Sequence, residues 1–341
     1  MMPNPPQVLI TGATGYIGGD VLQAILLKFP QLEPLICCLV RKPEYGERLQ
    51  SIYPSLKLVY GCFSDTLLLE ALASEVDIVI HCANIEDVSP TQALARGLAK
   101  RDRPGPAFWI CASGTDILAW ETIFHGSYGK TRDRVYNDME GVGEILALPD
   151  NAPHREVEAV QQAAGSDRVK VAIVCAPCIY GQGRGHGNQR SIQLPNLARS
   201  IIETGKAFMV GPGRNRWANV HIHDLSDLFV RLAGDAIDGG GKATWGLEGY
   251  YFAENGEHVW GEIAKSMAHE AQKQGLVVSP DVVSWTAEEA DQHLEYCALF
   301  YGTDSRCEAS RARQVLGWNP KMHSIVEEIP ATLAIEKRSV K

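Results

Sequence analysis

The sequence lacks an apolar run of the ~18 residues that a membrane-spanning helix needs. It also lacks a basic run that could neutralise a row of phosphates, since 41 acidic residues outnumber 32 basic ones and the formal net charge is -9. The first strand-like segment begins at Gln7, leaving no room ahead of it for the charged and apolar regions of a secretory signal. We therefore expect a cytoplasmic protein with no membrane partner and no nucleic-acid partner.

A disulfide framework is also missing. The nine cysteines are odd in number and irregularly spaced, and most lie in or beside apolar segments, where a free thiol packs as a small hydrophobic group. Cys175 and Cys178 have C-x-x-C spacing, but no second Cys/His pair has the spacing of zinc ligands. We expect free thiols and no metal.

Apolar segments are plentiful, at 45% of 341 residues, and they alternate in type along the chain. The strand-like segments are nearly continuous apolar runs, which is typical of a parallel sheet covered by helices on both faces. The pattern predicts an α/β fold with a doubly wound parallel sheet (Rossmann). The expected strands and helices are 7–11, 15–28, 35–40, 56–60, 66–74, 76–81, 91–100 and 107–111.

The alternation stops over residues 113–150, which are rich in aromatic, charged and glycine residues. Asp150 or Asn151 at the N-cap, with Pro153 in the first turn, predicts a helix to about residue 164, followed by a sixth strand over 169–175. Later segments are short and scattered. We expect residues 1–180, joined by 219–245, to form the dinucleotide-binding domain, and residues 181–218 and 246–341 to form a smaller, partly interleaved substrate lobe.

A glycine-rich turn directly follows the first strand and opens the first helix. Gly12 permits the tight turn, Gly15 lets the backbone approach a pyrophosphate, and Gly18 lets helix and strand pack closely. The helix N-terminus offers free N–H groups and a positive partial charge to the phosphates. This context predicts dinucleotide binding, with the contacts made by Gly12, Thr14, Gly15, Tyr16, Ile17 and Gly18.

The end of the second strand bears on the choice of cofactor. An acidic residue there would accept hydrogen bonds from a ribose 2′-hydroxyl, but this chain has Arg41 and Lys42 and no carboxylate until Glu44. Arg41 can clamp a phosphate and Lys42 can add a second charge. The pair favours NADP over NAD; the alternative is an ordinary solvated basic pair.

With these motifs the chain resembles the extended short-chain dehydrogenases/reductases, the group of nucleotide-sugar epimerases, dehydratases and dihydroflavonol-type reductases. The matching pieces follow the family's order across nearly the whole chain: Thr11–Gly18, Val79–Asn84, Cys111–Ser113, Ala176–Gly181, Val220–Asp224 and Leu316–Pro320. The resemblance implies that Cys82 and Ala83 line the cofactor, that Ser113 lies near the nicotinamide, and that Pro177 and Ile179 flank its amide. Cys62 departs from the family, which usually has an aspartate there beside the adenine.

The family's catalytic pair, Tyr-x-x-x-Lys on the helix before the sixth strand, is missing from that region. Counting back from Pro177 puts Asp150 and His154 where Tyr and Lys should stand. Counting forward from Ser113 reaches Tyr136, whose i+4 residue is the acidic Glu140. Tyr128 has Arg132 at i+4, but the surrounding sequence is a poor helix former.

His154 is the candidate replacement, because an imidazole exchanges protons near neutral pH. Glu158, four residues on, could orient it across one helical turn; the alternative is a helix-start histidine paired with a surface carboxylate. Ser113 is a candidate hydroxyl donor to the substrate, and Tyr136 a candidate acid from the inserted segment.

Three functions are compatible with these observations. The first is an NADP-dependent oxidoreductase acting on a carbonyl or imine of a small organic molecule. The second is a non-redox cyclase, isomerase or dehydratase that uses His154 or a loop tyrosine for proton transfer, and the third is a dinucleotide-sensing binding protein. The expected partners are a small-molecule substrate and, as a candidate assembly, a second copy in a homodimer; aromatic residues of the lobe, such as Trp217, could line an apolar substrate pocket.

Overall fold

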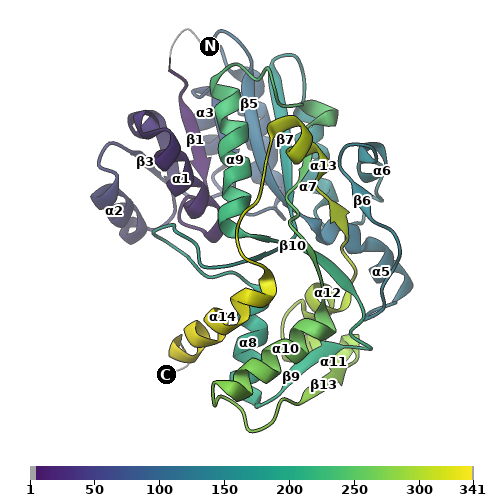
Figure 1. Ribbon diagram of the computed structural model, residues 1–341. Helices are drawn as coiled ribbons and strands as arrows, with labels where there is room; N and C mark the ends of the chain where they lie inside the picture. The colour runs from purple at the N-terminus through teal and green to yellow at the C-terminus, as the bar shows by residue number, and fades with distance from the viewer. Residues whose placement is uncertain (1–4, 340–341) are drawn as a thin grey trace.

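A computed structural model describes residues 5–339, and its centre is a seven-stranded parallel sheet (Figure 1). The chain starts in the middle of the sheet and winds toward both edges, so the doubly wound Rossmann arrangement is confirmed. In spatial order the strands are β11 (Tyr250–Phe252), β7 (Val169–Ala176), β5 (Ala107–Gly114), β4 (Ile78–His81), β1 (Val8–Thr11), β2 (Ile36–Val40) and β3 (Lys57–Tyr60).

Helices cover both faces of this sheet because its inner strands are apolar on both sides. β1 and β4 are buried along their whole length, as expected for parallel strands between helical layers. α1 and α9 pack against each other, as do α3 with α4 and α4 with α7. These helices, with α2 after β2, are α1 (Tyr16–Lys28), α2 (Pro43–Ile52), α3 (Thr66–Ser74), α4 (Val88–Lys100), α7 (Arg155–Ala164) and α9 (Ile222–Ile237).

A second apolar core lies in the lobe that Figure 1 shows below the carboxyl ends of the strands. Its helices are α8 (Gln193–Thr204), α10 (Trp260–Lys273), α11 (Ala287–His293), α12 (Cys297–Gly302) and α14 (Ile325–Ser339). Its strands are β8 (Cys178–Tyr180), β10 (Arg216–His221) and β12 (Glu257–Val259) in one small sheet, and β9 (Ala207–Val210) with β13 (Val282–Trp285) in another.

The inserted segment and the C-terminal part hold the remaining elements. A short sheet joins β6 (Tyr136–Asn137) to β14 (Cys307–Glu308), and short helices flank it: α5 (Trp120–His125), α6 (Val142–Leu146) and α13 (Ser310–Leu316). Among the residues described, no helix combines the length and the apolar character required to span a bilayer.

Three features differ from the sequence-based expectation. α9 begins at Ile222, because the His221 side chain caps it by accepting a hydrogen bond from the N–H of His223; the apolar run around Val220 therefore ends a strand and starts a helix. β11 joins the main sheet although the chain from 246 onward was assigned to the lobe, and three residues are too short for a periodic signal. α14, which closes the described chain, was not expected.

Candidate functional site

The turn between β1 and α1 has the geometry that a dinucleotide-binding loop needs. Gly12 has φ +78°, and a Cβ on Gly18 would lie 2.3 Å from the Gly12 carbonyl oxygen, so both positions require glycine. α1 has Gly15 as its N-cap, without a side-chain cap and without an acidic residue in its first turn. Its first N–H groups are therefore available to an anionic ligand.

The basic pair after β2 is exposed. Within residues 5–339 neither Arg41 nor Lys42 takes part in an ion pair, and Lys42 lies over the ring of Tyr45 at 6.0 Å. Cys62, just after the neighbouring strand β3, has its thiol 2.7 Å from the Ser64 hydroxyl. The positive charge at this edge of the sheet is thus free to meet a phosphate.

A cavity of about 400 Å³ opens at the carboxyl ends of β5 and β7, next to the glycine-rich turn. This volume lies in the range of small-molecule sites. It brings together most of the residues selected from the sequence for the nicotinamide end: Tyr16, Ile17, Cys82, Ser113, His154, Pro177 and Ile179. Ala83 lies beside the glycine turn, its backbone nitrogen 3.0 Å from where a Cβ on Gly12 would be.

His154 projects into this cavity between two carboxylates. Its Nε2 lies 2.6 Å from Asp116, and its Nδ1 lies 2.8 Å from Glu86 without a well-aligned hydrogen bond. Burial lowers the pKa of His154, but the charge and hydrogen bond of Asp116, with those of Glu86, outweigh burial and raise the pKa to about 10. The ring is an imidazolium at neutral pH. The two ring nitrogens face different carboxylates, so the imidazolium bridges Glu86 and Asp116. The two nitrogens could not both bind the same metal ion.

The local backbone differs from the expected helix start. His154 is the N-cap of α7 and has φ +61°, so it stands just outside the helix instead of inside it, and Asp150 is exposed in the preceding turn. The helix therefore begins about four residues later than the Asp-Asn-Ala-Pro sequence predicted. Neither Asp150 nor Asn151 is the N-cap. His154 occupies that position, and its side chain makes no capping hydrogen bond.

Glu158 does not hydrogen-bond His154, contrary to expectation. Its Oε1 accepts hydrogen bonds from the Ser113 hydroxyl at 2.5 Å and from the Tyr250 hydroxyl at 2.9 Å. Asp116 takes the orienting role instead, three residues after Ser113 on the segment that follows β5. Glu86, Asp116 and Tyr250 were not predicted as partners of this site, because they come from three separate segments and share no spacing with His154.

The two loop tyrosines lie elsewhere. Tyr136 is buried in β6, where its hydroxyl accepts a 3.3 Å hydrogen bond from Trp120 and its ring lies under the Arg134 guanidinium. Tyr128 packs against the lobe core. Neither lines the cavity, so Tyr136 is corrected from a candidate acid to a packing residue.

The lobe closes the other side of the cavity with mainly apolar groups. Ile192, Trp217 and Phe300 line it, together with Asn188 and Arg190. The Arg190 guanidinium is already held by Glu336, at 2.7 and 3.2 Å. The arginine is thus committed to a protein carboxylate, which leaves the cavity short of free positive charge on this side.

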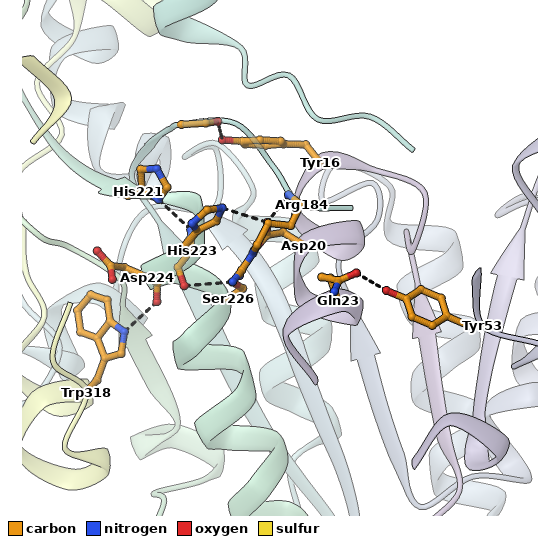
Figure 2. A network of polar contacts seen from close by, with 11 residues as sticks. Tyr16, Asp20, Gln23, Tyr53, Arg184, His221, His223, Asp224, Ser226 and Trp318 are labelled. Carbon is orange, nitrogen blue, oxygen red and sulfur yellow. Dashed lines mark hydrogen bonds and ion pairs between the residues drawn. The ribbon is translucent and has the colours of Figure 1, made fainter. Parts of the chain in front are cut away.

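The segment 181–190 crosses over the glycine-rich turn and is fastened to α1. The Arg184 guanidinium and backbone N–H bind the buried Asp20, which also accepts from Ser226 of α9 (Figure 2). Tyr16 donates to the carbonyl of Gly181, and the N–H of Asn188 donates to the carbonyl of Thr14. The crossing segment therefore encloses the turn from the lobe side.

Two comparisons with known sequences are informative. The chain is 39% identical, over 95% of its length and 95% of the relative's, to a protein named oxidase ucsJ from an Acremonium species. It is 21% identical to a dTDP-glucose 4,6-dehydratase of Mycobacterium tuberculosis over 66% of this chain and 68% of that one. No family model matches the chain.

Solved structures share the fold. The dTDP-glucose 4,6-dehydratase DesIV of Streptomyces venezuelae, solved with NAD bound, superimposes with a TM-score of 0.67 at 17% identity, covering 97% of both chains. A UDP-glucose 4-epimerase of Thermotoga maritima, solved with UDP-glucose, gives 0.65 at 12% identity and covers 98% of this chain and 100% of its own.

Proposed function

The chain belongs to the extended short-chain dehydrogenases/reductases of the NAD-dependent epimerase and dehydratase type, and we propose that it is an NADP-dependent oxidoreductase acting on a carbonyl or imine of a small organic molecule. The observation that carries the proposal is the cavity at the end of β5 and β7. It joins the glycine-rich turn, a hydroxyl and a charged imidazole in one space.

The residues at this end of the sheet fit a nicotinamide dinucleotide. Gly12, Gly15 and the uncapped N-terminus of α1 would hold the pyrophosphate, and Cys82, Pro177 and Ile179 would border the nicotinamide. Bound there, the cofactor would supply or accept the hydride. NADP is favoured over NAD by the unpaired Arg41 and Lys42, which match a 2′-phosphate.

His154 would act on the reacting oxygen of the substrate. Its imidazolium is anchored at Nε2 by Asp116, whereas Glu86, whose side chain is 66% exposed, can leave Nδ1 at little cost. The freed N–H would then donate a hydrogen bond that stabilises the negative charge developing on the substrate oxygen. Ser113 would orient the same oxygen.

The lining favours an apolar substrate over a nucleotide sugar. Trp217, Phe300 and four isoleucines form much of the wall, and the cavity's arginine, Arg190, is bound to Glu336. A diphosphate would lack a free cation there. An aromatic or alicyclic ketone, aldehyde or imine has the matching chemistry.

The test measures NADPH consumption in the presence of apolar carbonyl and imine compounds, beginning with phenanthrenequinone. Wild type should consume NADPH, and His154→Ala should turn over about 10²–10⁴-fold more slowly while still binding NADPH, since that is the usual contribution of a positioned acid. The Ser113→Ala variant should lose less if Ser113 only orients the oxygen. Normal turnover in the His154 variant would contradict the assignment.

A non-redox isomerase or dehydratase is the second candidate. The observation that favours it is the presence of two proton-carrying groups one helical turn apart, His154 in the lining of the cavity and Glu158 behind it, hydrogen-bonded to Ser113. In that case deuterium from solvent should enter the substrate's carbon skeleton while the cofactor remains unoxidised.

A further inference from the structure

A buried carboxyl group lies behind Ser113 and has no role in the function proposed above. Glu158 projects from the first turn of α7 into the space between that helix and the sheet, and it is 1% exposed. A charged carboxylate in such a place normally has a cationic partner. The contacts of Glu158 are different.

Two hydroxyl groups converge on one of its oxygens. Ser113, at the end of β5, donates to Oε1 at 2.5 Å, and Tyr250, on β11, donates to the same oxygen at 2.9 Å. Oε2 is buried and has no hydrogen-bond partner among residues 5–339. Protonation of this carboxyl group would remove the charge that burial penalises.

Within residues 5–339 no cation forms an ion pair with Glu158. The neighbouring guanidinium of Arg155 is directed to the carbonyl of Leu146 and to Gln162, and His154 is held by Asp116. Burial is the largest influence and raises the pKa of Glu158, against the hydrogen bonds of Ser113 and Tyr250 and the more distant positive charges of His154 and Arg155. The thiols facing it, Cys111 on β5 and Cys175 on β7, stay neutral because burial raises the pKa of each.

Ser113 connects this carboxyl group to the cavity. The serine is 4% exposed, is one of the residues that line the cavity, and donates its hydroxyl hydrogen bond to Glu158. A hydroxyl is both donor and acceptor, so it can pass a proton from one oxygen to another without changing its own charge.

We propose that Glu158 is the proton reservoir of the site and exchanges a proton with the substrate oxygen through the Ser113 hydroxyl. This rests on the proposed oxidoreductase function. In reduction, a reduced nicotinamide dinucleotide bound at the site would supply a hydride to the carbonyl carbon, and the C=O π electrons would move to oxygen. The Ser113 hydroxyl would turn from Glu158 to that oxygen and give it a proton, and Ser113 would take in return the proton that the Glu158 carboxylic acid carries on Oε1, which leaves a carboxylate; oxidation of an alcohol would reverse each step.

The relay separates two tasks at the site. His154, whose proton is held by Asp116, supplies positive charge, whereas Glu158 supplies the mobile proton. Glu158 is a positioning and proton-storing residue, because it acts on substrate only through Ser113. It stands four residues after His154.

A titration that needs no substrate tests the reservoir. In protein labelled with carbon-13 at glutamate carboxyls, one NMR resonance, absent from Glu158→Gln, should titrate above the usual range of about 4.3. It should move still higher in Ser113→Ala and in Tyr250→Phe, because each variant removes a hydrogen bond from the carboxylate. A resonance that titrates in the ordinary range, or that ignores Ser113→Ala, overturns the proposal.

Turnover tests the transfer, with phenanthrenequinone and NADPH as the probes. Reduction needs Glu158 protonated, so wild-type kcat should fall as pH rises through its pKa, ahead of the fall expected near pH 10 from His154. In Glu158→Gln the first limb of the pH profile, the fall of kcat at the pKa of Glu158, should be absent. Its kcat should be about a hundredfold lower, which is the lower bound for a positioned acid, while NADPH binds normally. Tyr250→Phe should shift that limb to higher pH, and Glu158→Asp should restore part of the rate.

The failures are distinguishable. If Glu158→Gln kept the pH dependence and the kcat of the wild type, the relay would be overturned and the oxidoreductase assignment would remain intact. Absence of NADPH binding in the wild type would overturn the oxidoreductase assignment, whereas the carboxyl titration would still report on Glu158 alone.

Discussion

At the residue scale, the site depends on side chains whose charge is set by their neighbours. His154 is 7% exposed, yet its pKa is raised to about 10 because Asp116 and Glu86 flank it, whereas burial raises the pKa of Glu158 against its hydrogen bonds and the charges of His154 and Arg155. The same helix turn thus presents a group that holds its proton and a group that can release one.

The paired charge at His154 should make stability depend on pH. Its folded pKa of about 10 lies above the unfolded value, so its contribution is fully present below about pH 6.5 and is lost as pH rises through 10. We expect His154→Asn to lower the melting temperature more at pH 6 than at pH 10, measured by calorimetry. A deficit that grows with pH would contradict the ion pairing with Asp116.

Arg41 should determine the choice of cofactor. Replacing it by alanine removes a charged hydrogen-bond donor from the 2′-phosphate, so NADPH affinity should fall roughly tenfold to a hundredfold, as expected for a bond of about 1.5–3 kcal/mol, while NADH affinity changes little. Calorimetric titration of both cofactors measures this. Lys337→Ala, an exposed cation on α14, is the control for general charge; a wild type without a preference for NADPH would contradict the assignment.

At the element scale, the turn between β1 and α1 combines three functions in a few residues. Gly12 bends the backbone away from β4, Gly15 begins α1, and Gly18 lets that helix lie against the turn. The segment 181–190 then closes over it through Arg184 and Asp20 (Figure 2).

We expect Gly15→Val to abolish dinucleotide binding. A branched side chain would occupy the space that the pyrophosphate needs, and even its Cβ would lie 3.1 Å from the Gly12 carbonyl oxygen. Cofactor titration measures the loss and circular dichroism the retained fold. Gly143→Val, at a position where a Cβ meets nothing within 4 Å, is the matched control. Unchanged cofactor affinity in folded Gly15→Val would reject the assigned loop.

At the scale of the whole molecule, the C-terminal part ties the lobe to the main sheet. After the lobe helices the chain returns through β14 and α13 to the main core, where Trp318 is 2% exposed and donates a hydrogen bond to the Asp224 carbonyl. Asp224 in turn accepts from the backbone of Lys321 and Met322, just before α14 re-enters the lobe.

Trp318→Ala should therefore destabilise the whole protein. Removing a buried tryptophan from a core costs about 3–5 kcal/mol, and here it also loosens the connection between the two cores. Denaturant unfolding measures the change. Val278→Ala, at a side chain 97% exposed, should stay within about 0.5 kcal/mol; equal effects of the two changes would mean that Trp318 does not support the core.

Local order along the chain was sufficient to predict six of the seven strands of the main sheet. The predicted helix 66–74 matches α3, and the first strands match within two residues, because each buried strand is a continuous apolar run and each boundary has a turn residue or a cap. The glycine turn could be located the same way, since its spacing from β1 and α1 is itself the signal. Ser113 and His154 were selected from family order, and both line the cavity.

The sequence by itself determined the class of fold and the position of the glycine turn. Only the tertiary structure decided which groups surround His154 and Ser113. Glu86 follows β4, Asp116 follows β5, and Tyr250 is on an edge strand more than ninety residues beyond Glu158. Such contacts have no sequence period, because parallel strands bring the ends of distant segments to one edge of the sheet. The protonation states follow from that convergence, since burial and neighbouring charge, not residue type, set each pKa.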